Sequence, residues 1–166
     1  MNSTKLELRK VLKAKRLALT PAEREQKSLI IIQKLAEAID WSKAVSVHCF
    51  EPIESLGEVN VISLFNDKDN VFTSRKTDGE WGKVSLEGNQ TIPEQFDVII
   101  VPMLGFDKNL HRIGYGGGYY DKFLATQPQA QKIGVCFEIG HVEKLPVETH
   151  DMALDVIVTE TTAYNR

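Results

Sequence analysis

Short runs of apolar residues alternate along the chain with longer segments in which apolar residues recur every three or four positions. The runs predict buried strands, and the periodic segments predict amphipathic helices. The segments that we expect to be strands are residues 44–50, 71–74, 98–102, 133–137 and 156–159. Those that we expect to be helices are residues 5–19, 21–39, 58–65 and 119–126. This alternation predicts an α/β protein with one domain over residues 1–166, built as three α/β/α layers around a mostly parallel, Rossmann-like sheet.

Local signals mark where some elements begin or turn. Thr20-Pro21-Ala22-Glu23 is a capping box with proline at the first helical position, so the second helix should begin at Pro21. The pairs Asp78-Gly79 and Glu87-Gly88 are typical of turns and favour a hairpin in this region. The first helix carries further basic residues that we interpret as solvated charges: Lys10, Lys13, Lys15 and Arg16.

Composition narrows the class of protein. The chain has 166 residues, of which 42% are apolar and 26% charged, as in an ordinary globular domain. Its formal net charge of −3 argues against broad nucleic-acid binding, and no apolar run is long enough to span a bilayer or act as a signal peptide. Cys49 and Cys136 lie in apolar segments, which favours buried thiols in a reducing compartment. We therefore expect a cytoplasmic monomer that binds small molecules rather than nucleic acid or membranes.

The segment from Arg112 to Asp121 carries the clearest chemical signal. It contains Gly114, Gly116, Gly117 and Gly118, and it lies between an expected strand and an expected helix. That arrangement aims backbone N–H groups at an anion. An arginine fork suits phosphate, and an aspartate suits Mg²⁺. The loop is neither a Walker loop nor a dinucleotide fingerprint, and glycine runs also occur in plain surface loops. Tyrosines, an arginine and an aspartate are unusual in such loops, so we predict a nucleotide site.

Phe106-Asp107 followed by Arg112-Ile-Gly-Tyr-Gly-Gly-Gly-Tyr-Tyr-Asp121 resembles the signature of the 5-formyltetrahydrofolate cyclo-ligase family, also called methenyltetrahydrofolate synthetases. Other pieces match in the family's order, and they are Lys5 and Arg9, Glu58, Val101-Pro102, Leu145-Pro146 and His150-Asp151. The resemblance covers nearly the whole chain and is weakest over residues 76–95. Several matches in the right order are much harder to obtain by chance than one motif.

This resemblance implies an activity. The family converts 5-formyltetrahydrofolate to 5,10-methenyltetrahydrofolate while ATP is hydrolysed to ADP and phosphate, and Mg²⁺ is its metal cofactor. Transfer of the γ-phosphoryl group to the formyl oxygen activates the formyl carbon, which N10 then attacks before phosphate leaves. Such a reaction needs positioning and charge neutralisation rather than a nucleophilic side chain. No catalytic triad can be recognised in the sequence, which agrees with this expectation.

The resemblance also implies a role for each matching residue. Arg112 and Tyr119 would act in catalysis, and Asp121 and Asp151 would bind Mg²⁺. The residues implied for ATP are Lys5, Arg9, Arg112, Ile113, Gly114, Tyr115, Gly116, Gly117, Gly118, Tyr119 and Tyr120. Those implied for the folate are Glu58, Tyr115, Gly116, Gly117, Gly118 and Tyr119. A carboxylate suits a pterin because the ring presents an edge of N–H donors.

Some residues have plainer interpretations when taken alone. Lys5 and Arg9 lie one helical turn apart, and in so basic a segment such a pair usually forms only a solvated face. Trp81 is expected to pack, while His111 is expected to line the site because it precedes Arg112. Leu110 stands where the family usually has glycine, so the turn before Arg112 should differ in geometry.

Two other functions stay open on the residues alone. The chain could be a non-catalytic nucleotide or phosphate sensor on the same fold, although a sensor would not need Arg112, Asp121 and Asp151 together. It could also be a sugar-phosphate or acyl-CoA enzyme, because related sheets host those chemistries. Such enzymes usually need a carboxylate nucleophile or a lysine base. No residue fits either role better than it fits a role in ATP binding.

Overall fold

The computed structural model describes residues 4–86, 88 and 90–166. The α-helices are α1 (Lys5–Ala18), α2 (Pro21–Ala38) and α3 (Tyr119–Ala125), and the 3₁₀ turns are η1 (Glu54–Leu56), η2 (Ile62–Phe65) and η3 (Glu138–Gly140). The strands are β1 (Val47–His48), β2 (Val71–Thr77), β3 (Glu80–Ser85), β4 (Val98–Pro102), β5 (Gly105–Phe106), β6 (Arg112–Ile113), β7 (Gln131–Val135), β8 (Val156–Val158) and β9 (Ala163–Asn165).

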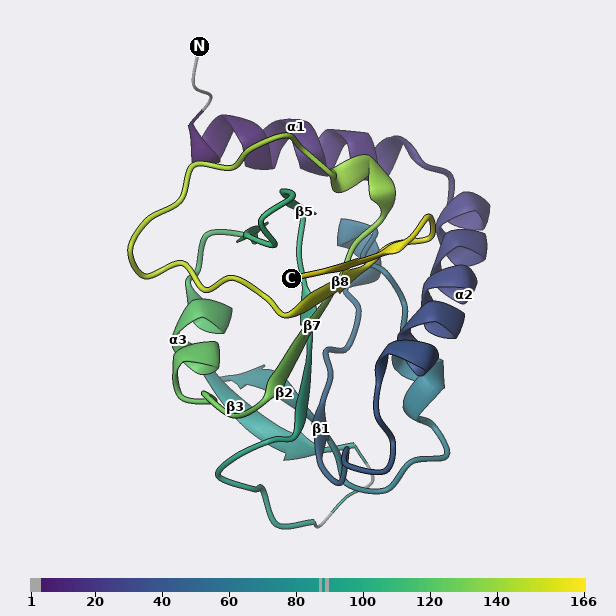
Figure 1. The fold of residues 1–166 in the computed structure, drawn as a ribbon, viewed down its shortest axis with the longest axis vertical. Helices are drawn as coiled ribbons and strands as arrows, with labels where there is room; N and C mark the ends of the chain where they lie inside the picture. Colours follow the sequence, from purple (N-terminus) through teal and green to yellow (C-terminus); the bar gives the residue numbers. More distant parts are fainter. Residues whose placement is uncertain (1–3, 87, 89) are drawn as a thin grey trace.

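One seven-stranded sheet with the order β3-β2-β1-β4-β7-β8-β9 organises the molecule. Strands β2, β1, β4, β7 and β8 are parallel, and the edge strands β3 and β9 are antiparallel. Helices α2 and α3 cover opposite faces of the sheet, while α1 lies across the end toward which the parallel strands run (Figure 1). The predicted α/β fold with a mostly parallel sheet is confirmed.

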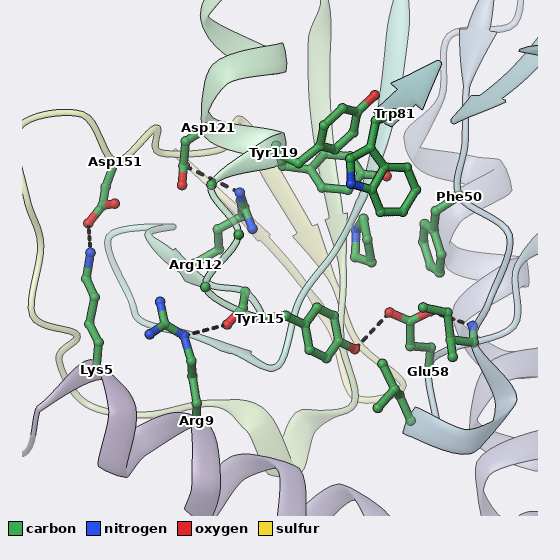
Figure 2. Close-up of a pocket in the computed structure, with 18 of the residues that line it drawn as sticks. Lys5, Arg9, Phe50, Glu58, Trp81, Arg112, Tyr115, Tyr119, Asp121 and Asp151 are labelled. Atoms are coloured by element: carbon green, nitrogen blue, oxygen red, sulfur yellow. Dashed lines mark hydrogen bonds and ion pairs between the residues drawn. The ribbon is translucent and has the colours of Figure 1, made fainter. Parts of the chain in front are cut away.

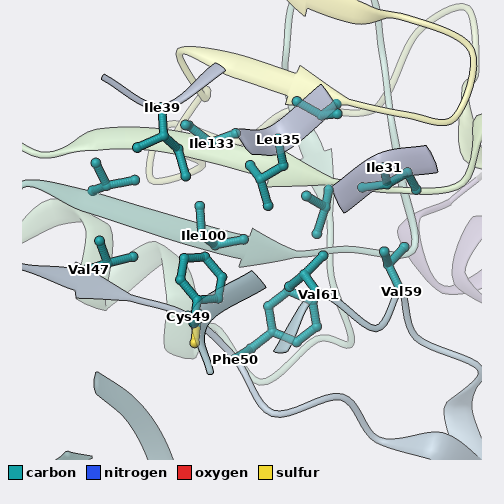
Figure 3. Packing of buried hydrophobic residues seen from close by; sticks show 14 of the residues in the cluster. Ile31, Leu35, Ile39, Val47, Cys49, Phe50, Val59, Val61, Ile100 and Ile133 are labelled. Carbon is teal, nitrogen blue, oxygen red and sulfur yellow. The ribbon is translucent and has the colours of Figure 1, made fainter. Parts of the chain in front are cut away.

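Strand β4 shows why a continuous apolar run suits the centre of this sheet. Successive side chains of a strand point to opposite faces. Ile100 packs toward α2, in a cluster with Leu35 and Ile133 (Figure 3). Its neighbour Ile99 packs toward α3, in a cluster with Phe123. Both faces are therefore apolar, and the alternation of a half-exposed strand is absent from this segment.

The two long helices begin at capping boxes. At α2 the Thr20 hydroxyl accepts from the Glu23 N–H, and the Glu23 carboxylate accepts from the Thr20 N–H, which confirms the predicted start. Thr4 and Glu7 make the same reciprocal pair at α1. Such a cap contributes on the order of 1 kcal/mol. Because Thr4 fixes the first turn of α1, it also sets where Lys5 points.

Two predicted elements are much shorter in the structure than expected. The strand expected over residues 44–50 is reduced to Val47–His48, because the Ser46 N–H donates to the Asp97 carboxylate at 2.8 Å instead of to a neighbouring strand. The helix expected over residues 58–65 is only the turn Ile62–Phe65. It starts late because the Asn60 N–H is taken by the Ser28 hydroxyl, 3.1 Å away.

The predicted hairpin is confirmed, since β2 and β3 pair antiparallel around Asp78 and Gly79. Both turn residues have positive φ, at 51° and 86°, as a tight two-residue turn requires. Glu87, half of the second expected turn pair, lies outside the described residues. The short β5–β6 ladder and the edge strand β9 have no counterpart among the predicted elements. In the part of the chain that the structure describes, no helix has the length and apolar character to cross a membrane.

Candidate active site

A cavity of about 720 Å³ lies beneath α1, beyond the carboxyl ends of β1 and β4. It is bounded by the first turns of α1, the segment after β1, the glycine loop before α3 and residues 148–151 (Figure 2). These segments are far apart in the sequence, and the fold brings them together around one space. The sequence-predicted residues that line it are Lys5, Arg9, Glu58, Arg112, Gly114, Tyr115, Gly116, Gly117, Gly118, Tyr119, Tyr120, Asp121 and Asp151.

The two cations of α1 are already engaged within the protein. The Lys5 ammonium donates to Asp151 at 2.6 Å and to Glu148 at 2.9 Å. Burial alone would lower the pKa of Lys5, but these carboxylates outweigh it and hold that pKa above its usual value. The pKa of Asp151 is lowered, because the hydrogen bonds from Lys5 and from the Glu148 N–H outweigh its desolvation. Arg9 Nε donates to the Gly114 carbonyl oxygen at 2.9 Å, which ties α1 to the glycine loop.

Arg112 is the most buried cation of the cavity, with a side chain only 6% exposed. Its Nη2 lies 3.3 Å from the Asp121 carboxylate, and its guanidinium carbon lies 5.6 Å from the Tyr120 ring centre. Burial lowers the pKa of Arg112, and Asp121 opposes that shift. The buried Nε of Arg112 has no hydrogen-bond partner among the residues that the structure describes. A buried donor without an acceptor is costly, and an oxygen-bearing ligand could satisfy this group if the guanidinium turned toward the cavity.

Two glycines of the loop are required by their surroundings. A Cβ at Gly114 would lie 2.8 Å from Arg112 Nη1, so a larger residue would push that guanidinium away. Gly116 has φ of +100°, and a side chain there would also press on the Arg9 guanidinium at 3.3 Å. Only glycine adopts that backbone conformation without strain. The glycines therefore allow two arginines to approach the loop backbone.

Glu58 lies across the cavity from the cations and is buried. Its Oε1 accepts from the Tyr115 hydroxyl at 2.8 Å, and its Oε2 accepts from the Ile53 N–H at 2.7 Å. Arg16 completes this chain by donating to the Tyr115 oxygen at 2.5 Å and to the Met103 carbonyl at 3.1 Å. Burial and the Glu58 carboxylate raise the pKa of Tyr115. Tyr115 thus links the glycine loop to the carboxylate.

The interpretation of Arg16 as a solvated charge is wrong, because its side chain is buried against the loop. The prediction for Trp81 also needs correction. Its indole is 49% exposed, lines the cavity and stacks on Tyr119 with ring centres 5.1 Å apart. In the sequence, Arg16 belongs to a run of surface-like lysines, and Trp81 lies in the region of weakest resemblance. Neither position carried a local signal that could have revealed its role.

Two residues expected near the ligand lie elsewhere. Ile113 is buried in an apolar cluster with Leu12, and its side chain does not line the cavity. His111 is also outside the cavity lining, and its Nδ1 lies 3.4 Å from the Asp107 carboxylate. Leu110 has a φ of 61°, a left-handed conformation that glycine adopts easily and leucine rarely, so the turn keeps the backbone conformation of a glycine, and a difference in its geometry stays a prediction. The leucine is nevertheless buried, so packing holds it there.

The cavity also contains oxygen ligands suited to a metal ion. Asp151 belongs to a group with Glu148 and His150, whose possible ligand atoms all lie within 4.8 Å of one another. Asp121, the other residue predicted to bind metal, is outside this group and pairs with Arg112. Carboxylate oxygens are the ligands that Mg²⁺ prefers. The residues present therefore fit a divalent cation near Asp151, while Asp121 lies beside the buried arginine.

Comparison with known proteins shows the family of the chain. The model of the 5-formyltetrahydrofolate cyclo-ligase family matches residues 74–160. The chain is 30% identical over 161 residues to the 5-formyltetrahydrofolate cyclo-ligase of Mycoplasma pneumoniae, covering 92% of this chain and 96% of the relative. It is 28% identical over 194 residues to the mouse enzyme of the same name, and the match covers 96% of this chain and 95% of the mouse enzyme.

Solved structures give the same result. A 5,10-methenyltetrahydrofolate synthetase from Mycoplasma pneumoniae superposes with a TM-score of 0.81 at 27% identity, over 95% of this chain and 99% of that one. The 5,10-methenyltetrahydrofolate synthetase of Aquifex aeolicus superposes with a TM-score of 0.82 at 30% identity, over 97% of this chain and 92% of that one. The similarity therefore extends over the whole fold and includes the segments that form the cavity.

Proposed function

Because the chain belongs to the 5-formyltetrahydrofolate cyclo-ligase family, we propose that it cyclises 5-formyltetrahydrofolate to 5,10-methenyltetrahydrofolate in a reaction driven by ATP. The observation that carries this proposal is the division of charge in the cavity. Lys5, Arg9 and Arg112 lie on one side, and Glu58 lies on the other among aromatic rings (Figure 2). A triphosphate matches the first side, and a flat ring with a donor edge matches the second.

The nucleotide is assigned to the cationic side. Arg112 offers a planar fork and a buried Nε that needs an acceptor, and phosphate oxygens satisfy both. Lys5 releases Asp151 and Glu148 when it turns to a phosphate, so ATP binding exchanges one ion pair for another. Gly116, Gly117 and Gly118 present backbone to the same space. The loop therefore holds the transferred phosphoryl group near both substrates.

The folate is assigned to the side of Glu58. Each carboxylate oxygen of Glu58 already accepts one hydrogen bond, and each has a further lone pair for a pterin N–H. Trp81 and Phe50 line the same part of the cavity and offer apolar surface to an aromatic ring. The buried Arg16 holds Tyr115 against Glu58, which keeps the carboxylate oriented before the substrate arrives.

In the proposed reaction the bond from the γ-phosphorus to ADP breaks, and a bond from that phosphorus to the formyl oxygen forms. N10 then attacks the activated formyl carbon and loses its proton. That attack closes the ring, and inorganic phosphate then departs with the former formyl oxygen, which leaves the C=N bond of the methenyl product. The protein positions the two substrates and neutralises phosphate charge, chiefly through Arg112 and Lys5. Tyr119 lies at the start of α3, where its hydroxyl can contact the reacting oxygens.

We place the Mg²⁺ that this chemistry uses near Asp151, with Asp121 as the second carboxylate. A bound Mg²⁺ neutralises phosphate charge and orients the phosphate oxygens. Asp151 also accepts from the Glu148 N–H at 2.8 Å, and this bond can keep its orientation when Lys5 turns to a phosphate. Asp121 holds the Arg112 guanidinium in place beside the same phosphates.

The direct test of the proposed function is to mix the protein with Mg-ATP and 5-formyltetrahydrofolate. The expected result is the rise in near-ultraviolet absorbance that methenyltetrahydrofolate produces, together with one ADP per product. Omission of either ATP or the folate should abolish both signals. A protein that binds ATP but yields neither product would be a sensor, and the proposal would be wrong.

Replacement of Asp121 by Asn should raise the Mg²⁺ concentration that gives half-maximal rate by about tenfold, because a carboxylate near the metal is lost. The measurement is the initial rate titrated against Mg²⁺ at saturating ATP and folate. Asp67→Asn, at an exposed position away from the cavity, is the matched control and should leave the titration unchanged. An unaltered Mg²⁺ dependence in a folded Asp121→Asn protein would remove Asp121 from the metal site.

A further inference from the structure

Behind the cavity wall lies a buried histidine to which the proposed function gives no role. His48 on β1 is fully buried, and aromatic rings surround it, with ring centres 4.7 Å away at Phe123 and 5.4 Å away at Phe96. Its Nε2 lies 2.9 Å from the Ser74 hydroxyl oxygen. His48 does not line the cavity, so any effect on a ligand must pass through a neighbour.

Ser74 is that neighbour, and it connects His48 to the site. The register of β1 and β2 pairs His48 with Phe72, which places Ser74 one full strand repeat further along the same face. The Ser74 hydroxyl is hydrogen-bonded in turn to the Tyr119 hydroxyl. Both Ser74 and Tyr119 line the cavity. A continuous chain of hydrogen bonds therefore runs from a buried ring nitrogen to the proposed catalytic tyrosine.

The histidine stays neutral over the working range of the protein. Burial, together with the charge of Lys83, lowers the pKa of His48 to about 3. A neutral imidazole carries one N–H and one bare nitrogen. The nitrogen that holds the hydrogen therefore decides the direction of the hydrogen bond between His48 and Ser74, and it biases the next bond in the chain.

Two directions let the Ser74 hydroxyl donate one hydrogen bond and accept the other. If Nε2 carries the hydrogen, it donates to Ser74, Ser74 donates to Tyr119, and the Tyr119 hydrogen is left to donate into the cavity. If Nδ1 carries it, each bond reverses, and the Tyr119 oxygen can only accept. Within the described residues Nδ1 has no hydrogen-bond partner. A buried N–H without an acceptor is rarer than a buried acceptor without a donor, which favours hydrogen on Nε2.

We propose that His48 is a positioning residue that acts through Ser74 to direct the Tyr119 hydroxyl hydrogen toward an acceptor oxygen of the substrate. This inference rests on the proposed function, in which the acceptor is the formyl oxygen or a phosphate oxygen that it meets. A pterin edge of N–H donors would be the wrong partner for a hydroxyl directed in this way. The chain therefore separates the part of the cavity that receives the reacting oxygens from the part that receives the ring.

The first experiment needs no activity. Nitrogen-15 NMR of the ligand-free protein distinguishes the protonated ring nitrogen from the bare one, and His48→Gln identifies the His48 signals among the four histidines. We expect a neutral ring with hydrogen on Nε2. Hydrogen on Nδ1 would overturn the proposed direction. This result stands even if the protein proves inactive, so failure of the proposed function and failure of this inference are distinguishable.

The second experiment tests the effect on turnover. His48→Leu should lower kcat about fivefold with little change in either KM, the effect of one lost neutral hydrogen bond. His48→Gln should restore most of kcat, since its amide can donate from a similar position. In a Tyr119→Phe background, His48→Leu should cause no further loss. If His48→Leu lowered kcat equally in both backgrounds, or if Gln gave no rescue in a folded protein, the role of His48 would be structural only.

Discussion

Replacement of Arg112 by Ala should lower kcat by about a thousandfold, at the lower end of what removal of a charge-stabilising arginine costs in phosphoryl transfer. Arg112 is the most buried cation that lines the cavity. Among the described residues, its Nε has no hydrogen-bond acceptor. Water that fills the space left by the side chain carries no charge, so it cannot replace the guanidinium. The measurement is the single-turnover rate of methenyltetrahydrofolate formation at saturating substrates, beside a thermal unfolding curve.

Arg112→Lys is the informative control, because it keeps the charge and loses the fork. A lysine cannot make paired hydrogen bonds with a phosphate, so we expect an intermediate rate. Asp121 loses its partner in Arg112→Ala, but its side chain is partly exposed, and both variants should fold. A folded Arg112→Ala protein with a rate within about tenfold of the original would contradict a direct role in charge neutralisation.

Replacement of Glu58 by Gln should raise KM for 5-formyltetrahydrofolate by one to two orders of magnitude and leave KM for ATP nearly unchanged. The substitution keeps the size of the side chain but turns an N–H donor toward the donor edge of the pterin. A mismatched buried polar group costs about 1–3 kcal/mol, or roughly one to two decades in affinity. The measurement is initial rate as each substrate is varied with the other saturating.

Lys5→Ala should show the reverse selectivity, with a higher KM for ATP and little change for the folate, because an ammonium favours only the phosphates. Glu54→Gln is a matched control, since Glu54 precedes Glu58 by four positions and is exposed. Weaker ATP binding with unchanged folate binding in Glu58→Gln would show that the two substrates have been assigned to the wrong sides of the cavity.

The sequence predicted those parts of the fold that depend on local patterns. Strand β4 is apolar at every position before its terminal proline, and the Thr20 capping box lies next to the helix that it starts. The segment around Glu58 was predicted wrongly, because its backbone is fixed by a distant residue, Ser28. Apolar spacing contains no information about such a partner.

The same distinction applies to the candidate site. The glycine loop could be recognised because its residues are contiguous, and the structure adds the reason that Gly114 must be small. Arg16 could not be recognised, because its partner Tyr115 is distant in sequence. Trp81 reaches the cavity only because the β2–β3 hairpin projects it there. When the contacts of a residue lie far away in the sequence, the residues next to it in the chain do not reveal its role.

The position of α1 has a consequence for the synthesis of the protein. This helix is made before the strands of the sheet, yet Leu12 packs against Leu104, Ile113 and Leu145, and Lys5 pairs with Asp151. A nascent chain folds as its segments emerge, so α1 must wait with its apolar stripe uncovered while the sheet forms beneath it. The cavity is complete only when residues 148–151 have been made. A chain that stops before Asp151 could hold most of the sheet and still lack part of the side that we assign to the nucleotide, so we expect binding only after this late segment has been synthesised.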